Sequence, residues 1–380
     1  MNEAERELDH LLRIVADHVD LDHCRRVDER YRQALGWEEV DAPPLVVQAG
    51  FGSVIPLPEP WSRFRHYPYR ETFAQPAAML QNMLLERVVP GLILKDDNPL
   101  AVRNNHGVVQ LASALTGTWS MVEDDYPWLG RLDSLDRVRE VAGGEGLDPA
   151  AGLLPVVAET LAFYREALAR YPVCRETVQI SLPDLQGPMD TAEQLWGSEI
   201  HYAFTDEPEL LARLLSRIVD AMILAWRLLR PYAINRLEAL AHTQHGYQVP
   251  GRLMVRNDSS TLLSGRTYAR FIRPHDARLL DGVGGGTIHF CGNGQHLVGE
   301  MLAIPGLRGL DFGQPDQMDV AAAYAMCREK RVALTHLIPT RDDLLSGNAR
   351  RNFPTGAVFV YQPTSLDDAR AVLAAHRRCQ

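Results

Sequence analysis

The residue pair His289 and Cys291 has the side-chain types and the spacing that could hold a metal ion. Both lie in the run Gly286–Gly292, which reads Gly-Thr-Ile-His-Phe-Cys-Gly and is followed by Asn293 and Gly294. If this run is a β-strand, residues two apart point to the same face, so an imidazole and a thiol project side by side where the glycines end the strand. Such a pair offers two ligands to a borderline-soft ion such as zinc, or a polar pair to a substrate. A buried histidine beside an inert buried cysteine is the alternative, and only the setting can decide between them.

The segments around this pair alternate between predicted strands and helices. Eight short apolar runs bounded by turn residues have the character of strands, and apolar residues at helical spacing fill most of the intervals between them. The eight runs are Leu45–Gly50, Gly91–Leu94, Val178–Leu182, Leu253–Arg256, Ile288–Cys291, Leu307–Phe312, Val332–Leu337 and Val358–Tyr361. In a chain of 380 residues this alternation predicts parallel βα units closed into a (β/α)₈ TIM barrel. A doubly wound open sheet is less favoured, because no predicted strand is followed by a Gly-x-Gly-x-x-Gly loop.

In a barrel of this kind the active site lies at the carboxyl ends of the strands. Most of the predicted ends carry a polar or ionisable side chain. These residues are Asp96 and Asp97, Asp184, Asp258, His289 with Cys291, Asp311, His336, and Tyr361 with Gln362. A lone Asp at such an end often caps a helix, but acids, imidazoles and a thiol at so many ends favour a catalytic site. The predicted catalytic residues are Asp184, Asp258, His289 and Cys291.

Two stretches rich in loops and aromatic side chains are predicted to cover this site. The first is Phe51–Arg70, and the second carries His106 and then the acidic segment Glu123–Trp128. Barrels build their substrate pockets from loops, and prolines lower the cost of ordering them. The predicted substrate-binding residues are His106, Trp61, Tyr67, Asp124, Trp128, Asp311 and Tyr361. Packing of the aromatic residues in a dimer interface or an outer layer is the alternative.

Composition excludes several classes of protein. A net charge of -10 leaves no basic surface for nucleic acid. Met1–Arg13 is charged, and no stretch approaches the roughly 18 apolar residues of a membrane span, so a cytoplasmic protein without a membrane segment is expected. The five cysteines are spread without a Cys-x-x-Cys motif, which predicts reduced thiols. Residues 1–42 are predicted to form an N-terminal helical extension and residues 43–380 the barrel.

The sequence resembles the uroporphyrinogen decarboxylase superfamily, which includes zinc methyltransferases that move methyl groups from methylcorrinoid proteins to coenzyme M. The matching segments are Leu182–Pro188, Asn257–Ser260 with Leu263 and Ser264, Tyr268–Pro274, and above all Ile288–Gly292. The resemblance covers roughly Pro43–Arg377. It implies a (β/α)₈ barrel with Zn²⁺ at His289 and Cys291, a small-molecule substrate and a methylcorrinoid as methyl donor. It also implies a corrinoid protein as partner and suggests a homodimer.

The chain departs from the family in two places. The decarboxylases carry arginines after the first strand that grip substrate carboxylates, whereas this chain has none in Val47–Gly52. The methyltransferases take a third metal ligand from a Cys beyond the last strand, where this chain reads Tyr361–Thr364, and Cys379 lies past a further helix. Since a catalytic zinc site usually has three protein ligands and an open position, His336 is predicted to join His289 and Cys291, with Asp258 or Asp311 as alternatives to His336.

Three functional hypotheses follow. The first is metal-dependent methyl transfer to a thiol or another acceptor. The second is a metal-free decarboxylase of a tetrapyrrole-like or other small carboxylated substrate, in which Asp184 or Asp258 stabilises the positive charge of a protonated ring. The third is a catalytically silent ligand-binding barrel. A bound metal would separate the first from the other two.

Overall fold

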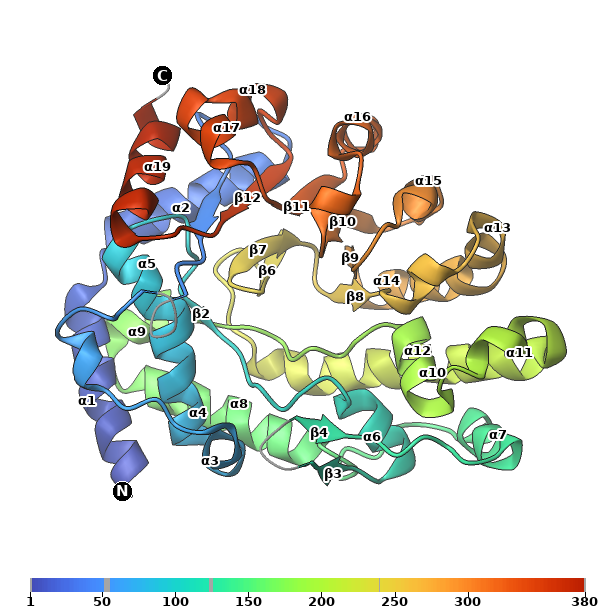
Figure 1. Ribbon diagram of the computed structural model, residues 1–380. Helices are drawn as coiled ribbons and strands as arrows, with labels where there is room; N and C mark the ends of the chain where they lie inside the picture. Colours follow the sequence, from blue (N-terminus) through green and yellow to red (C-terminus); the bar gives the residue numbers. More distant parts are fainter. Residues whose placement is uncertain (1, 51–54, 123–125, 239, 379–380) are drawn as a thin grey trace.

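The structure is a computed structural model that describes residues 2–50, 55–122, 126–238 and 240–378. Helices and parallel strands alternate along much of the chain (Figure 1). The strands are β1 (Leu45–Val47), β2 (Ala101–Val102), β3 (Ser120–Met121), β4 (Pro127–Trp128), β5 (Gln179–Ile180), β6 (Ala241–Gln244), β7 (Tyr247–Pro250), β8 (Met254–Arg256), β9 (Gly286–Phe290), β10 (Leu307–Phe312), β11 (Ala333–Leu337) and β12 (Ala357–Tyr361).

The helices are α1 (Glu3–His18), α2 (Leu21–Leu35), α3 (Tyr69–Ala74), α4 (Pro76–Met83), α5 (Val89–Leu94), α6 (Gln110–Thr116), α7 (Leu135–Gly143), α8 (Leu154–Ala169), α9 (Pro172–Thr177), α10 (Pro188–Trp196), α11 (Ile200–Asp206), α12 (Pro208–Leu229), α13 (Gly265–Thr267), α14 (Arg273–Val283), α15 (Val298–Met301), α16 (Val320–Lys330), α17 (Arg341–Ser346), α18 (Asn348–Asn352) and α19 (Leu366–Arg378). The longest helices are α1, α2, α8 and α12. Two π-helical turns, η2 (Leu84–Val88) and η5 (Tyr268–Ile272), precede α5 and α14. The residues predicted as an N-terminal helical extension, 1–42, contain α1 and α2.

Six strands form one parallel sheet in the order β1-β12-β11-β10-β9-β8, and β2 pairs with β5 in a separate parallel sheet. The described residues therefore form no closed sheet, so the predicted closed barrel is not confirmed, whereas the mixed α/β class with parallel strands is. β1 is joined to the segment before β2 mainly by side chains: Asp97 accepts from the amide of Leu45 and Asp96 from that of Val47, and one backbone bond runs from the amide of Asp97 to the carbonyl of Leu45. These bonds join the two sheets at this edge.

The other edges, β5 and β8, approach each other without backbone pairing. Gly187 follows β5, and a Cβ at that position would lie 1.8 Å from the carbonyl oxygen of Arg256 at the end of β8. Only glycine permits so close an approach of two backbones. The end of β5 is thus brought to the end of β8, although the sheet stays open between them.

A two-stranded antiparallel hairpin, β6–β7, lies on the concave side of the six-stranded sheet (Figure 1). We call it the interior hairpin. Its residues Ala241, Tyr247 and Val249 form a buried cluster with inner-face residues of the sheet and with α2. Those partners are Val27, Tyr31, Leu35, Val46, Met254, Ala333, Val358 and Val360. The space enclosed by the sheet is therefore filled by the hairpin and by α2.

The opposite face of the sheet is covered by helices such as α15, α16 and α19 (Figure 1). Strand alternation separates the two faces: Val358 and Val360 belong to the inner cluster, and Phe359 between them belongs to the outer core. The same alternation places Ile288 and Phe290 in the outer core. His289 therefore points inward, toward the hairpin.

The prediction of a strand at Gly91–Leu94 was wrong. These residues end a continuous helical stretch, Pro76–Leu94, which stops at Lys95 in the left-handed region (φ 54°). A short apolar run cannot by itself distinguish a buried strand from a buried helix, and the strand lies further on, at Ala101–Val102. The stretch Pro76–Leu94 is long and apolar enough to cross a membrane, contrary to the sequence analysis, but its apolar window is 83% buried inside the protein, as in a core helix.

The carboxyl of Asp276 on α14 is fully buried. Its Oδ2 accepts hydrogen bonds from Asn257 (2.6 Å) and Tyr268 (2.7 Å), while its Oδ1 has no partner among the described residues. Burial raises the pKa of Asp276 to about 7, against the lowering effect of the two hydrogen bonds. The folded protein thus holds this proton over a pH range in which the unfolded chain releases it.

This shift predicts a pH-dependent difference between the wild type and Asp276→Asn. As pH rises from about 4 to 7, the wild type should lose the stability that comes from its tighter folded-state proton, whereas the neutral amide loses none. Because one pKa unit corresponds to about 1.4 kcal/mol, the difference in unfolding free energy between the two proteins should change by a few kcal/mol. Urea unfolding at pH 4.5 and pH 8 measures it, and an unchanged difference would contradict the shift.

Candidate metal centre

Three potential metal ligands come together at the carboxyl ends of β8 and β9. Asp258, His289 and Cys291 each offer one ligand atom, and these atoms all lie within 4.8 Å of one another. His289 Nε2 is 3.5 Å from Cys291 Sγ and 3.7 Å from Asp258 Oδ1. We call these residues the Asp-His-Cys cluster. The side-by-side placement of His289 and Cys291 agrees with the period-two spacing, although Cys291 lies just beyond the strand.

The imidazole of His289 is oriented by a buried carboxylate. Its Nδ1 lies 2.6 Å from Oδ1 of Asp311, which turns Nε2 toward the cluster. Burial alone would lower the pKa of His289, but the contacts with Asp311 and Cys291 raise it to about 9. Burial opposes ionisation of Asp311, and the hydrogen bond and charge of His289 nevertheless hold its pKa well below the usual range. A carboxylate on the far nitrogen of a histidine is the usual support of a metal-binding imidazole.

The backbone of Asp258 is fixed by hydrogen bonds, whereas its carboxylate is partly exposed to solvent. The amides of Asp258 and Ser259 donate to the buried carboxylate of Asp190 at 3.1 and 2.9 Å. Oδ1 of Asp258 accepts the amide of Cys291 at 2.7 Å, which ties the ends of β8 and β9 together. The Asp258 side chain is 41% exposed, whereas His289 is buried. The cluster is therefore closed toward the interior and open on one side.

The donor set suits zinc. Imidazole nitrogen, thiolate sulfur and carboxylate oxygen are the three ligand types that Zn²⁺ takes in proteins, and three protein ligands with an open position characterise its catalytic sites. Asp311 holds the far side of His289 and so belongs behind the ligands. His336, the predicted third ligand, lies outside the cluster: its ring stacks on Tyr247 at 5.7 Å and its Nδ1 donates to the carbonyl of Phe312.

A second charged group lies beside the cluster. Asp184, after β5, pairs with Arg256 at 2.8 Å and lies 3.9 Å from Arg103, which follows β2. Gln186 donates its backbone and side-chain amides to the other carboxylate oxygen. Burial opposes ionisation of Asp184, but the two arginines hold its pKa well below the usual range. Two guanidinium groups against one carboxylate leave a local excess of positive charge in an acidic chain.

Both arginines retain unused donors. Nη1 of Arg103 and Nε of Arg256 are buried and have no hydrogen-bond partner among the described residues. A buried N–H group without a hydrogen-bond acceptor is costly, and an anionic group on a ligand would supply one. Neither arginine was among the residues predicted for the site. The sequence feature that could have pointed to them is their position: Arg103 directly follows a short apolar run, and Arg256 ends one.

The tip of the interior hairpin adds two residues that the sequence analysis missed. His245 accepts a hydrogen bond from Arg256, and its ring centroid is 5.8 Å from that of His289. Burial and the neighbouring arginines hold the pKa of His245 well below its ordinary value, so it is neutral. Tyr247 donates to Asp311 at 2.9 Å. The signal was the His245-Gly246 turn, where both residues have positive φ as a tight two-residue hairpin requires.

The structure does not bring the predicted aromatic residues to the cluster. Trp61 is buried against His18 of α1, at 5.0 Å between ring centroids. Tyr67 is also buried, and its hydroxyl donates to Glu7 of α1. Trp128 is 64% exposed on β4. This placement of Trp61 and Tyr67 matches the alternative of an outer layer.

The remaining predicted substrate-binding residues have other partners. His106 is fully buried against Phe73, and burial lowers its pKa to about 4. Tyr361 donates to Asp368 at 2.8 Å. Asp124 lies outside the described residues. The two loops do meet each other, because the rings of Tyr69 and Tyr126 are in edge contact at 4.8 Å.

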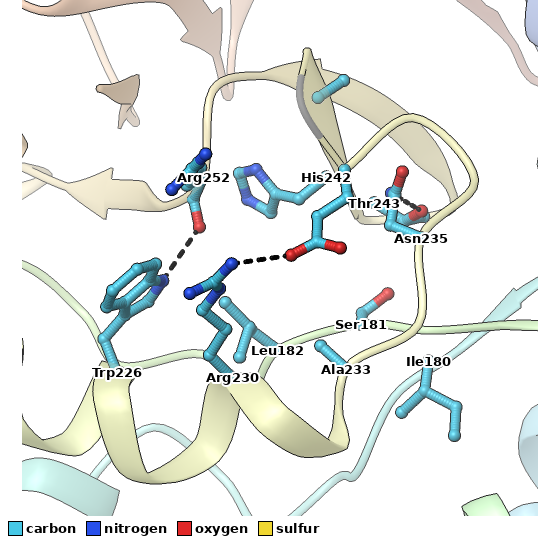
Figure 2. Close-up of a pocket in the computed structure, with 12 residues that line it drawn as sticks. Ile180, Ser181, Leu182, Trp226, Arg230, Ala233, Asn235, His242, Thr243 and Arg252 are labelled. Carbon is cyan, nitrogen blue, oxygen red and sulfur yellow. Dashed lines mark hydrogen bonds and ion pairs between the residues drawn. The ribbon is translucent and has the colours of Figure 1, made fainter. Parts of the chain in front are cut away.

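A separate pocket lies where β5 and β8 fail to pair. Figure 2 shows its walls: Ile180, Ser181 and Leu182 on one side, Trp226 from α12 and Arg230 just after it on another, and His242 and Thr243 from the interior hairpin. The Arg230–Glu238 ion pair also borders it. None of the Asp-His-Cys residues lines this pocket, so it is distinct from the candidate metal centre.

Comparison with known proteins bears on the fold. No protein-family model matches the chain, and no relative is found among curated proteins. Among solved structures, a methyltransferase from Methanosarcina mazei is similar, with a TM-score of 0.62 over 92% of this chain and 98% of that chain at 16% sequence identity. At this identity the likeness shows that the two chains share a fold over nearly their whole lengths.

The Asp184–Arg256 pair predicts a stability effect. Arg256→Met leaves the buried carboxylate with Gln186 and the more distant Arg103, and breaking a buried pair from one side typically costs about 3 to 5 kcal/mol. We expect a loss in unfolding free energy near the lower end of that range, measured in urea. Asp184→Asn combined with Arg256→Met should recover part of it. A double variant no more stable than Arg256→Met would show that the loss has another source.

Proposed function

We propose that this protein is a metal-dependent methyltransferase in which Asp258, His289 and Cys291 hold a zinc ion. The observation that carries the proposal is the convergence of these three donors within 4.8 Å, with His289 oriented by a fully buried Asp311. The fold shared with a methyltransferase from Methanosarcina mazei supports the same class of reaction. Zinc, when bound, would lower the pKa of a coordinated thiol and favour the thiolate.

The residues of the chain have separate roles in this proposal. The Nδ1–H of His289 donates to Asp311, and Nε2 is therefore the ring nitrogen that His289 offers as a ligand. Cys291 supplies the thiolate, and Asp258 supplies an oxygen in place of the sulfur that the family resemblance implies. The partly exposed side of the cluster, at Asp258, is where an acceptor can enter.

The acceptor and donor belong to the proposal as well. The excess of positive charge on Arg103 and Arg256 over Asp184 favours an acceptor thiol that also carries a negative charge. In the transfer, a bond forms between the acceptor sulfur and the methyl carbon. With a methylcorrinoid as donor, the cobalt–carbon bond breaks and cobalt keeps the electron pair. A corrinoid protein is then the expected partner.

Decarboxylation is less well supported. That mechanism needs Asp184 or Asp258 free to face a cationic ring, but Asp184 is already paired with Arg256 and bonded by Gln186. Asp258 lies instead with two other candidate metal ligands, His289 and Cys291. Both observations favour methyl transfer.

The metal content of purified protein tests the ligand assignment. Wild-type protein prepared without chelators should contain roughly one zinc ion per chain, and His289→Ala and Cys291→Ser should contain little, because each loses one of three ligands. Cys379→Ser, at a cysteine outside the described residues, is the control and should keep its zinc. Circular dichroism confirms that the variants fold. Equal zinc in all four proteins would remove these residues from the site.

Substrate charge tests the role of the arginines. With methylcobalamin as donor, Arg103→Gln should raise the KM for 3-mercaptopropionate about 10-fold, the equivalent of one charge-assisted hydrogen bond. The KM for the neutral 2-mercaptoethanol should change little. Equal changes for the two thiols would show that Arg103 does not bind the acceptor's charge.

A further inference from the structure

The interior hairpin contacts Asp311, behind the candidate metal centre, through the side chain of Tyr247. Tyr247 is the first residue of β7 and is 1% exposed, and its ring stacks on His336 with the two planes 9° apart. The hydroxyl of Tyr247 donates to Oδ2 of Asp311 at 2.9 Å. Its position is fixed by the packing of β7 between β9, β10 and α2, so the hydroxyl has little freedom to move away.

The two carboxylate oxygens of Asp311 accept hydrogen bonds from different groups. Oδ2 accepts from Tyr247 and from the hydroxyl of Thr335, at 2.9 and 2.5 Å. Oδ1 is bonded to Nδ1 of His289 at 2.6 Å. Because two donors from different elements hold Oδ2, the carboxylate cannot rotate about its axis without losing one of them. Oδ1 therefore stays aimed at His289.

We propose that Tyr247 is a positioning residue for the metal centre, acting through Asp311 on the orientation of His289. The part of this inference that concerns metal affinity rests on the proposed function. It extends that function by assigning a role to the interior hairpin, which supplies none of the three ligands. Partners behind a metal-binding histidine typically change metal affinity by about 10- to 100-fold when removed.

The chain offers a matched control. Tyr268 is also fully buried, and its hydroxyl also donates to a buried carboxyl group, that of Asp276, at 2.7 Å. Among the described residues, the side chain of Asp276 has no hydrogen bond or ion pair with the Asp-His-Cys cluster, and its other partner is the side chain of Asn257. Tyr247→Phe and Tyr268→Phe therefore remove the same group from the same kind of site, and only the first removes it from behind His289.

Two readouts separate positioning from general stability. The first is the affinity of the protein for Co²⁺, measured by competition with a chelator. The second is the proton NMR signal of the His289 Nδ1 proton in metal-free protein, assigned by its loss in His289→Ala. Tyr247→Phe should weaken Co²⁺ binding about 10-fold and shift or broaden this signal. Tyr268→Phe should leave both at the wild-type values while lowering thermal stability.

The outcomes distinguish this inference from the proposed function. Wild-type protein that fails to bind Zn²⁺ or Co²⁺ would overturn the proposed function, and the NMR signal alone would then decide the role of Tyr247. An unchanged signal in Tyr247→Phe, or an equal loss of Co²⁺ affinity in Tyr268→Phe, overturns the positioning role. If Tyr247→Phe does not fold, Thr335→Val removes the other donor to Oδ2 with little change in volume. An unchanged His289 signal in that variant also overturns the proposal.

Discussion

The hydrogen bonds of one buried carboxylate, Asp311, connect most of the features that define this structure. A charge with no exposed surface is tolerated only when its oxygens are satisfied, because an unpaired buried ion costs several kcal/mol. Asp311 meets that condition with three partners from three elements: His289 of β9, Thr335 of β11 and Tyr247 of the interior hairpin. Asp311 thus links the interior hairpin to the inward face of β9. The same hydrogen bonds also set the orientation of His289.

A second set of charges lies beside the first and differs from it in sign. Around Asp258 and Asp311 the carboxylates outnumber the imidazole, which suits a cation. Around Asp184 the arginines outnumber the carboxylate, which suits an anion. The neutral His245 lies between the two sets, bonded to Arg256 and facing the ring of His289. A bound molecule that coordinates a metal at one end and carries a negative charge at the other would match both.

The openness of the sheet also has a physical cause. β2 and β5 are only two residues long, and on its other edge the backbone of Ile180 in β5 already pairs with the backbone of Ile234, so β5 has no free backbone groups there for β8. Asp96 and Asp97 bridge one gap with side chains, and a pocket borders the other. Residues at the strand ends still converge, because Gly187 allows the backbone after β5 to approach the end of β8. The convergence of the site therefore does not depend on a continuous ring of strands.

The sequence by itself determined the elements and the pair that could bind a metal. Seven of the eight predicted strands overlap observed ones, since alternation and turn residues are local signals, and the period of a strand placed His289 beside Cys291. Only the tertiary structure decided what joins them. Asp258 rather than His336 completes the cluster, Trp61 and Tyr67 pack on α1, and Arg103, His245 and Tyr247 reach the site from distant segments. Contacts between residues far apart in the chain depend on packing geometry, which leaves no periodic trace in the sequence.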